Sequence, residues 1–376
     1  MEAASGRAGY ARAVTHFSTP ALARMHDALA AHVAREAGLT GLVALVSRRG
    51  ETHADAIGAL SEGGPPMTRD TIFRIASMTK PITAAAAMLL VEDGVIGLDD
   101  PVDRFLPELA NRKVLRAIDS PLDDVVPLRR PITLRDLLAL TCGFGMILAA
   151  PGRYPVQKAY DDAGMAPAAR IPRFPPDEWM ARLAALPSVR QPGEAWMYHS
   201  GLDVTGVLIA RATGKSFSAF LRERIFDPLG MKDTAFFVAP EKASRLAACY
   251  RRGADKKLTL SDDPATSTYL KEPTFFSGGG GLTSTITDYL RFAEMLRRGG
   301  ELDGARILGP RTIDLMRQNH LPGGRDLTQL AIGAFSETAY EGVGFGLGFA
   351  QTLSEVGAGT VGAGDYYWGG AASTIF

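Results

Sequence analysis

The amino-acid sequence predicts an α/β protein in which a long, mostly helical region lies between strand-forming parts. Three observations predict this class. A helical pattern from Thr19 is followed by two strand-like segments on either side of the turn Arg48–Gly50. From about residue 81 to 276 the apolar spacing is mostly helical, with long loops. Beyond Gly344 glycine alternates with apolar residues, which is typical of a strand.

The N-terminal elements have clear start and stop signals. Thr19 and Pro20 are favourable at the N-cap and first position of a helix, and Gly38 is favourable at its end. The segments Gly41–Val46 and Thr52–Leu60 flank the turn and predict a β-hairpin. We expect this helix and hairpin to form one part of a sheet layer, which further strands from elsewhere in the chain would complete.

Capping patterns mark helices in the middle region. Thr133–Asp136 and Ser200–Asp203 each place an acidic residue three positions after a hydroxyl residue, the spacing of a capping box. The stretch 146–192 is rich in proline and alanine and has one credible helix, around Asp177–Leu186. No lysine follows the cluster Gly278–Gly281 at the spacing of a phosphate-binding loop, so we expect close backbone packing there.

The composition excludes several classes of protein. The 376 residues carry 41 lysines and arginines against 41 acidic residues, so nothing in the charge points to nucleic acid. No apolar run is long enough to span a bilayer. Two cysteines, Cys142 and Cys249, are too few for a disulfide framework or a cysteine-rich zinc site, and the H-E-x-x-H metal pattern is missing. We therefore expect a soluble cytoplasmic protein with no cofactor or metal and no nucleic-acid or membrane partner. The oligomeric state stays open.

The candidate nucleophile is Ser77, in the sequence Ser-Met-Thr-Lys that ends at Lys80. A serine hydroxyl needs a nearby group to accept its proton, and on a helix Lys80 lies one turn away on the same face. Pro81 has no N–H group and belongs in the first turn of a helix, which places Ser77 at the helix N-terminus. The alternative is a capping serine followed by a surface lysine.

A second candidate is Tyr198-His199-Ser200, which precedes a predicted helix. We expect a tyrosine next to a lysine and a helix N-terminus to form a phenolate more easily, because positive charge lowers the pKa of the phenol. The alternative makes Ser200 an N-cap and Tyr198 a core aromatic residue. A Ser-His-Asp triad is disfavoured, because the G-x-S-x-G pattern is absent and none of the six histidines has a recognisable triad context.

Three motifs, in order, resemble those of the serine β-lactamase-like hydrolases. They are Phe73–Lys80, Tyr198–Ser200 and Trp368–Gly370. The flanking segments that share the resemblance are Asp93–Leu106, Leu138–Gly143 and Phe226–Met231. The resemblance covers most of the chain from about residue 40 onward.

This resemblance implies a β-lactamase/transpeptidase-like fold of two parts. An antiparallel sheet flanked by helices would be formed by residues 1–80 and 277–376, and a mostly α-helical domain with long loops by residues 81–276. In the family further strands and a helix follow the third motif, whereas six residues follow Gly370 here. We therefore expect these C-terminal strands and the helix to be missing.

The resemblance also implies the roles of the motif residues. Ser77 would be the nucleophile, with Lys80 and Tyr198 as a coupled general base. The oxyanion hole would be formed by the backbone N–H groups of Ser77 and Ala371. The residues that would line the substrate pocket are Trp368, Gly369 and Gly370.

Two departures from the β-lactamases determine the expected activity. The third motif of class C β-lactamases and penicillin-binding peptidases is K-T-G, and Trp368 replaces its lysine with an apolar wall. His199 is bulkier than the alanine usual in those β-lactamases. Both features look like the carboxylesterases of family VIII in this superfamily.

We therefore expect a serine carboxylesterase that hydrolyses short-chain or small hydrophobic acyl esters through an acyl-enzyme on Ser77. Its partner is a small-molecule ester, and weak β-lactamase activity is a side reaction compatible with the same chemistry. The alternatives within the fold are a β-lactamase or D-Ala-D-Ala peptidase, and an acyltransferase. The alternative outside the enzymes is an inactive or truncated binding module, which a serine-directed phosphonate probe would not label.

Overall fold

The described parts of the chain form two compact units in the computed structural model. The structure describes residues 16–35, 38–166, 172–332, 340–354 and 362–376. The first unit comprises residues 1–71 and 245–264, and the second comprises residues 72–244 and 265–376. The predicted sheet domain, 1–80 with 277–376, and the predicted helical domain, 81–276, divide the chain differently and stay a prediction.

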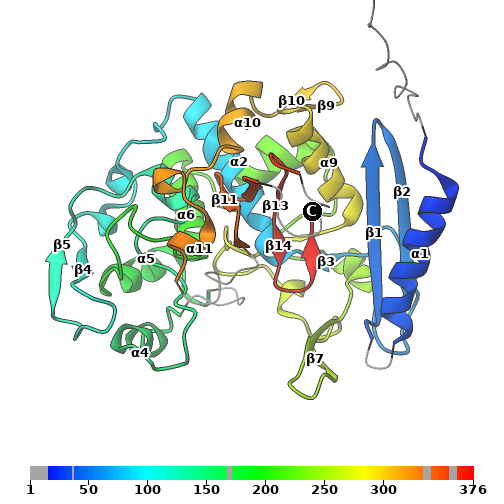
Figure 1. Cartoon of the computed structure of the whole chain (residues 1–376), viewed down its shortest axis with the longest axis horizontal. Helices are drawn as coiled ribbons and strands as arrows, with labels where there is room; N and C mark the ends of the chain where they lie inside the picture. The colour runs from blue at the N-terminus through cyan, green and yellow to red at the C-terminus, as the bar shows by residue number, and fades with distance from the viewer. Residues whose placement is uncertain (1–15, 36–37, 167–171, 333–339, 355–361) are drawn as a thin grey trace, which may run out of the picture. The chain divides into compact units, whose positions relative to one another are not determined.

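The first unit is built on the predicted N-terminal helix and hairpin. Its elements are α1 (Thr19–Ala34), β1 (Gly41–Arg48), β2 (Glu51–Gly58), β6 (Cys249–Arg252) and β7 (Leu258–Asp262). β1 and β2 are antiparallel from the Gly41–Gly58 pair to the Arg48–Glu51 pair (Figure 1). α1 contacts β2, and His26 Nδ1 lies 3.1 Å from Asp55 Oδ1. The prediction of a helix and a hairpin is confirmed.

The second unit holds most of the helices and the candidate catalytic residues. Its α-helices are α2 (Thr79–Glu92), α3 (Leu134–Leu138), α4 (Pro155–Asp162), α5 (Pro176–Ala184), α6 (Ser200–Thr213), α7 (Phe217–Leu221), α8 (Asp227–Leu229), α9 (Ile286–Arg297), α10 (Pro310–Met316) and α11 (Leu327–Leu330). Its strands are β3 (Phe73–Arg74), β4 (Lys113–Leu115), β5 (Val125–Pro127), β8 (Thr283–Ser284), β9 (Glu301–Leu302), β10 (Ala305–Arg306), β11 (Val343–Phe345), β12 (Ala350–Thr352), β13 (Tyr366–Tyr367), β14 (Gly369–Gly370) and β15 (Thr374–Ile375).

Shorter helical turns connect these elements. The 3₁₀ turns are η1 (Ala76–Met78), η2 (Val102–Arg104), η3 (Pro107–Leu109), η5 (Pro240–Arg245), η6 (Thr268–Leu270) and η7 (Pro322–Gly324). A π-helical turn, η4 (Arg222–Phe226), joins α7 to α8.

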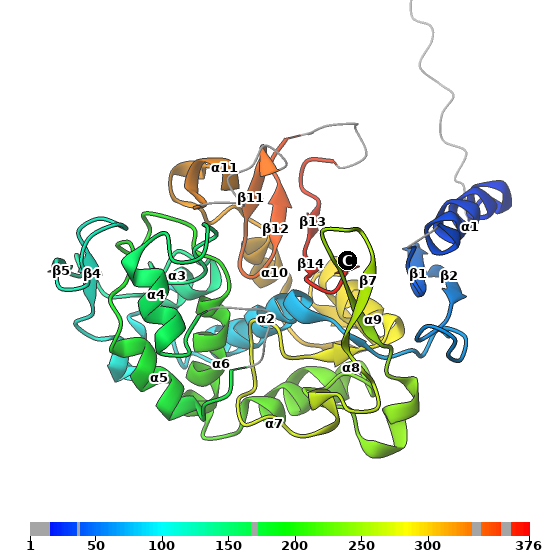
Figure 2. The same ribbon diagram turned by 90° about the horizontal axis from the view of Figure 1, so that it is seen from below.

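α2 is the core helix of the second unit. Every residue from Thr79 to Leu90 is buried, as expected of a helix that is largely apolar all round. α6 packs against α2, and α3 packs against α6. In both ribbon views α2 crosses the middle of the second unit (Figures 1 and 2). The first turn of this helix, which carries Lys80, is therefore fixed by core packing.

The chain beyond Gly344 forms hairpins rather than the single strand that the sequence predicts there. Within 345–349 the chain turns at Gly348, whose φ is 90°, so β11 and β12 pair as antiparallel neighbours. β13 adds to β12 and completes a three-stranded sheet. The stretch 366–376 is divided as well, because β14 pairs with β15 across a turn in which Ser373 has a φ of 60°. Alternating glycine and apolar residues have the two-residue period of a strand, but glycine also adopts the positive φ of the turns that end a strand.

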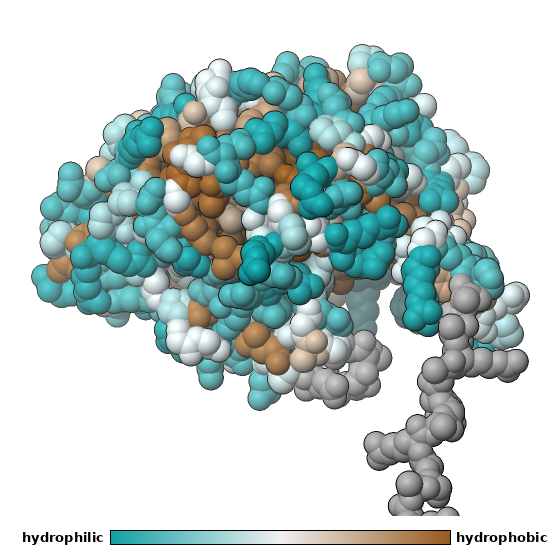
Figure 3. Space-filling model, turned by 90° about the horizontal axis from the view of Figure 1, so that it is seen from above, coloured by the Kyte–Doolittle hydropathy of each residue, from teal (hydrophilic) through white to brown (hydrophobic). Residues whose placement is uncertain are grey.

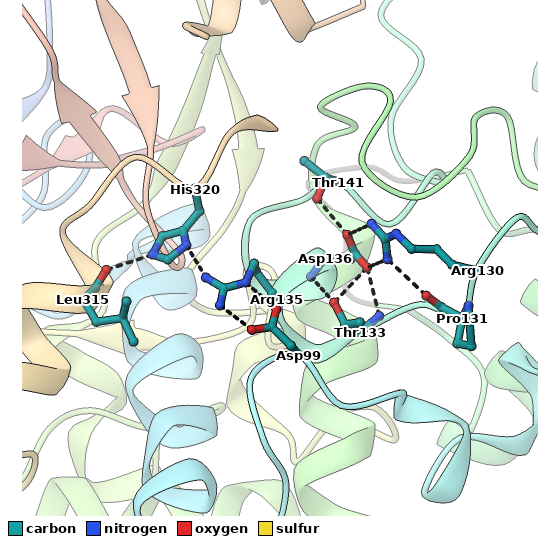
Figure 4. A network of polar contacts seen from close by, with 9 residues as sticks. All are labelled: Asp99, Arg130, Pro131, Thr133, Arg135, Asp136, Thr141, Leu315 and His320. Carbon is teal, nitrogen blue, oxygen red and sulfur yellow. Dashed lines mark hydrogen bonds and ion pairs between the residues drawn. The ribbon is translucent and has the colours of Figure 1, made fainter. Parts of the chain in front are cut away.

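α3 begins with the predicted capping box. The Thr133 hydroxyl accepts a hydrogen bond from Asp136 N, and the Asp136 carboxylate accepts one from Thr133 N. Arg130 adds two hydrogen bonds to the same carboxylate, at 2.5 and 2.8 Å. Figure 4 shows this carboxylate surrounded by its donors.

A second group of polar contacts joins α3 to distant segments of the second unit (Figure 4). Arg135 donates to both oxygens of Asp99, at 2.6 and 2.7 Å, and to His320 Nδ1 at 2.7 Å. His320 Nε2 lies 2.8 Å from Leu315 O and donates to it. The imidazole is therefore held as a neutral ring with its proton on Nε2.

The described residues of the stretch 146–192 form two helices where the sequence predicts one. α5 is the predicted helix. α4 begins after Tyr154, whose backbone N–H donates to the Gln157 side chain at 3.0 Å. This local cap supports a helix in a segment whose composition resembles that of a loop.

Apolar side chains form the core of the second unit, and they also reach its surface. On the face drawn in Figure 3 apolar residues gather in a hollow that hydrophilic residues surround. No helix among the described residues combines the length and the apolar character needed to cross a membrane.

Candidate active site

Ser77 lies in η1, the turn directly before α2, as the sequence predicts. The segment before it is fixed, because β3 pairs with β8 and Ile75 N donates to Leu282 O at 3.1 Å. Ala76 has a φ of 44°, which is uncommon for a residue other than glycine. The chain therefore bends sharply just before Ser77, whose exposed fraction is 8%.

Lys80 places its amine beside the serine hydroxyl. Its Nζ is 3.0 Å from Ser77 Oγ and donates to Gly279 O at 2.6 Å. Burial lowers the pKa of Lys80 to about 7, although the negative charge of Asp203 opposes this shift. At neutral pH a large share of this amine is therefore uncharged and has a lone pair that can accept a proton.

Tyr198 brings a phenol to the same place. Its ring centroid is 4.2 Å from Lys80 Nζ, and its hydroxyl is hydrogen-bonded to Ser77. Burial raises the pKa of Tyr198, and the hydrogen bonds with Ser77 and Trp368 offset only part of that rise. The prediction of a lowered phenol pKa is wrong, because desolvation of a phenolate at this buried position outweighs its favourable neighbours.

Trp368 belongs to a buried aromatic cluster and is 5% exposed. Its ring centroid lies 5.2 Å from that of Phe345, 5.6 Å from that of Tyr198 and 6.3 Å from that of Trp196. Its indole Nε1 donates to Tyr198 OH at 2.9 Å. The sequence predicts an apolar surface at this position. It does not predict the hydrogen bond to the phenol oxygen, because the two residues are 170 positions apart and no local pattern links them.

β14 brings the third motif against the segment before the nucleophile. A Cβ on Gly370 would lie 2.4 Å from Ile75 O, so this approach requires glycine. Thr374 Oγ1, on the paired strand β15, donates to the same oxygen at 3.2 Å. Gly369 forms the other residue of β14, and Ala371 is the first residue of the turn that follows.

His199 and Asp203 form a buried pair behind Lys80 that no motif in the sequence indicates. His199 Nδ1 lies 3.3 Å from Lys80 Nζ, and its Nε2 lies 3.2 Å from Asp203 Oδ2. Asp203 Oδ1 accepts from Ser277 Oγ at 2.6 Å and from Gly279 N at 2.8 Å. Burial acts to raise the pKa of Asp203, but His199 and these donors together hold it below its ordinary value.

The predicted capping box at Ser200–Asp203 is therefore wrong. The N-cap of α6 is His199, without a side-chain capping bond, and Asp203 is directed into the site. The available signal is the spacing of His199 and Asp203, because residues four apart on a helix face each other. Another prediction holds nearby, since a Cβ on Gly278 would lie 2.3 Å from Leu202 O. The glycine cluster is a place of close backbone packing.

Two further features of the described residues bear on ligands. No group of three or more histidine, cysteine, aspartate or glutamate residues among them could hold a metal ion. A cavity of about 350 Å³ is lined by residues between Val102 and Ile132, and none of the candidate site residues lines it.

The sequence and the fold are similar to known proteins. A family model described as Beta-lactamase matches residues 25–376. Protein Rv1367c of Mycobacterium tuberculosis is 38% identical over 343 residues, which are 89% of this chain and 82% of that protein. Esterase EstB of Burkholderia gladioli is 34% identical over 376 residues, 95% of this chain and 87% of that protein. The solved structure of EstCE1, a hydrolase with promiscuous acyltransferase activity, matches with a TM-score of 0.74 and 28% identity, covering 93% of this chain and 88% of that one.

Proposed function

Since the chain belongs to the beta-lactamase family and has its β-lactamase/transpeptidase-like fold, we propose that it is a serine carboxylesterase. Its substrates are short-chain or small hydrophobic acyl esters. The observation that carries this proposal is the separation of 3.0 Å between Ser77 Oγ and a buried Lys80 amine whose pKa is about 7. The similarity to an esterase across 95% of the chain supports the ester substrate.

In the proposed acylation step, Ser77 Oγ attacks the carbonyl carbon of the ester while its proton passes to Lys80 Nζ. The tetrahedral intermediate carries an oxyanion, which the backbone N–H groups of Ser77 and Ala371 stabilise. When the intermediate collapses, the bond to the leaving oxygen breaks and the alcohol takes the proton. The acyl group stays on Ser77 as an ester.

Tyr198 acts in this step as a neutral acid rather than a phenolate. Its raised pKa keeps the phenol protonated, and its hydroxyl is hydrogen-bonded to Ser77. We assign it the transfer of the proton between Lys80 and the leaving oxygen, with Trp368 fixing its position. Water then attacks the acyl carbon while Lys80 accepts one of its protons. When the bond between Ser77 Oγ and the acyl carbon breaks, that proton passes to Oγ, which restores the serine hydroxyl and releases the acid.

Trp368 supports small apolar acyl groups over substrates that carry a carboxylate. The residue supplies aromatic surface and no cation at the place where β-lactamases and peptidases have a lysine. EstCE1, described as a hydrolase with promiscuous acyltransferase activity, supports transfer of the acyl group to a second alcohol as the second candidate. Both activities share the acyl-enzyme and differ in the nucleophile that removes the acyl group.

Intact-mass spectrometry with 4-nitrophenyl acetate and butyrate tests the proposal. We predict that the parent protein gains one acyl group on Ser77 and that Ser77→Ala gains none. Hydrolysis should fall about a million-fold in Ser77→Ala, the usual order for a lost nucleophile. Residual activity within tenfold of the parent would remove Ser77 from the mechanism.

The same experiment separates the alternatives. Benzylpenicillin turnover comparable to the best ester would overturn the esterase assignment in favour of a β-lactamase. Added alcohol that diverts the acyl group into a new ester identifies the acyltransferase. A chain that neither acylates nor reacts with a serine-directed phosphonate is a binding module and contradicts the proposal.

A further inference from the structure

The buried amine of Lys80 has three polar neighbours. Its Nζ lies 3.0 Å from Ser77 Oγ, 3.3 Å from His199 Nδ1 and 2.6 Å from Gly279 O. A carbonyl oxygen can only accept a hydrogen bond. One N–H group of Lys80 is therefore directed at Gly279, whatever the charge of the amine.

The neighbouring carboxylate determines where His199 carries its proton. The side chains of His199 and Asp203 are 7% and 3% exposed, and their closest polar atoms are 3.2 Å apart. An ionised carboxylate only accepts hydrogen bonds, and Ser277 and Gly279 N already donate to its other oxygen. In the neutral imidazole the proton therefore lies on Nε2, toward the carboxylate, and Nδ1 presents its lone pair to Lys80.

We propose that the His199–Asp203 pair aims the lone pair of neutral Lys80 at the nucleophile, so that both are positioning residues. This inference rests on the proposed function, because it concerns the base of the same acylation step. A neutral amine has two N–H groups and one lone pair. When Gly279 O and His199 Nδ1 accept the two N–H groups, the lone pair is left facing Ser77 Oγ.

The same contacts serve the amine after it has accepted the proton. The ammonium form of Lys80 has three N–H groups, and two of them keep Gly279 O and His199 Nδ1 as acceptors. The third is directed at the serine oxygen, from which the proton came. The negative charge of Asp203 favours this cation across the imidazole.

The backbone around the pair is shaped to hold it. His199 has a φ of 84° and a ψ of −65°, which is rare for a residue other than glycine. A Cβ on Gly279 would lie 3.0 Å from both Asp203 Oδ1 and His199 Cε1, so the pair lies directly against the glycine backbone. Unusual backbone conformations persist where the surrounding structure requires them, often at functional sites.

Asp203→Asn tests the role of the carboxylate. The amide oxygen can still accept from Ser277 and Gly279, but the amide nitrogen donates to His199 Nε2. The imidazole proton then moves to Nδ1, which points a donor at Lys80 and misdirects its lone pair. We expect kcat for 4-nitrophenyl butyrate to fall about 100-fold, the lower range of general-base effects, with KM within about threefold.

The pH profile gives a readout that a purely structural role would not move. The titratable groups that face Lys80 are Tyr198, His199 and, behind the imidazole, Asp203. The charge of Asp203 holds the pKa of Lys80 up. Asp203→Asn should therefore shift the acid limb of kcat/KM to lower pH, in addition to lowering its plateau.

A pair of substitutions at His199 gives an independent test. His199→Asn keeps an acceptor, Oδ1, near the position of Nδ1, and asparagine tolerates a positive φ. His199→Leu removes the acceptor and keeps similar bulk. We expect His199→Asn to remain within about tenfold of the parent and His199→Leu to lose about 100-fold in kcat.

Asp288→Asn is the matched control. Asp288 is a buried carboxylate in the first turn of α9 that accepts from one hydroxyl, of Thr234, and one backbone N–H, of Asp233. We expect it to cost stability without changing kcat or the pH profile. If Asp203→Asn does not fold, the two His199 variants decide the question.

The outcomes keep this inference apart from the proposed function. A parent that does not acylate at Ser77 contradicts the proposed function. An active parent whose folded Asp203→Asn and His199→Leu variants remain within about fivefold overturns the positioning role. ¹⁵N NMR of the parent histidines needs no variant to fold, and an Nδ1–H tautomer at His199 would also overturn it.

Discussion

At the scale of single residues, burial acts on two side chains in opposite directions. Desolvation penalises the charged form of each group, so it lowers the pKa of Lys80 and raises the pKa of Tyr198. Both are therefore most stable as neutral groups, one a base and the other an acid. Above about pH 7 the hydroxyl of Ser77 therefore lies beside an uncharged amine and an uncharged phenol.

We predict that kcat/KM for an activated ester rises with pH through about 7 and then levels off. The pKa of Lys80 is lowered to about 7, so the base is protonated below that pH and free above it. Tyr198 stays protonated over the same range. Initial rates between pH 5 and pH 9 measure the profile, and activity that declines from pH 6 to pH 8 would contradict the role of Lys80.

A second prediction concerns the indole of Trp368. Trp368→Phe keeps an aromatic ring in the cluster but removes the donor to Tyr198 OH. Loss of a partner from a buried polar group costs about 1–3 kcal/mol, so we expect kcat to fall roughly ten- to hundredfold with a smaller change in KM. Trp179→Phe, which changes a buried tryptophan packed against Phe275, is the control and should affect stability only. Equal kcat in Trp368→Phe and the parent contradicts the positioning of the phenol.

At the scale of elements, one local pattern has two outcomes. Thr133–Asp136 forms its capping box, whereas Ser200–Asp203 does not. Both have the same spacing, so the difference comes from tertiary contacts. Asp203 finds a histidine, a serine hydroxyl and the backbone of Gly279, which together stabilise the carboxylate more than one helix-end N–H can. A local sequence pattern cannot predict which of these partners Asp203 binds, because Gly279 is 76 residues away.

The third motif gives a prediction at this scale. A Cβ on Gly370 would lie 2.4 Å from Ile75 O and 2.2 Å from Thr374 Oγ1, whereas a Cβ on Gly369 would only touch Thr374 O at 3.4 Å. Gly370→Ala must therefore displace β14 from η1, and Gly369→Ala need not. We expect Gly370→Ala to lower kcat/KM at least tenfold more than Gly369→Ala, since a shift of about 1 Å can cost a hundredfold. Similar kcat/KM values for the two alanine variants would show that the position of β14 does not affect the reaction, and would contradict this prediction.

At the scale of the whole molecule, the sequence predicts which residues gather at the candidate site better than it predicts the structure around them. Ser77, Lys80, Tyr198 and Trp368 are recognisable from short patterns, and the structure brings them together. The family and the fold class are confirmed. Two predictions are wrong: the lowered pKa of the Tyr198 phenol, and the single strand beyond Gly344, where the chain forms a hairpin. Burial and turn geometry depend on segments far apart in the chain, which no local period records.

A prediction at this scale uses the contacts of His320. Burial and the charge of Arg135 lower the pKa of His320, so the folded protein binds its proton less readily than the unfolded chain. The resulting stability is present above the unfolded value of about 6.5 and is lost as pH falls through the lowered value. We expect the melting temperature to fall between pH 7.5 and pH 5 by more in the parent than in His320→Gln, which does not titrate. If calorimetry gives the same fall in melting temperature for the parent and for His320→Gln, the proposed contribution of His320 to stability is contradicted.

The contact between Thr374 Oγ1 and Ile75 O joins residues 299 positions apart. Such non-local contacts form slowly, because a long loop must close before they contribute. On the ribosome, synthesis of that interval takes roughly 15–60 s at about 5–20 residues per second. During that time the nascent chain already carries Ser77, but not β14 and β15, which contact the turn η1 that holds it. The order of synthesis thus places Ser77 in the chain well before Ala371, so in the proposed mechanism the oxyanion hole is complete only after that residue has been made.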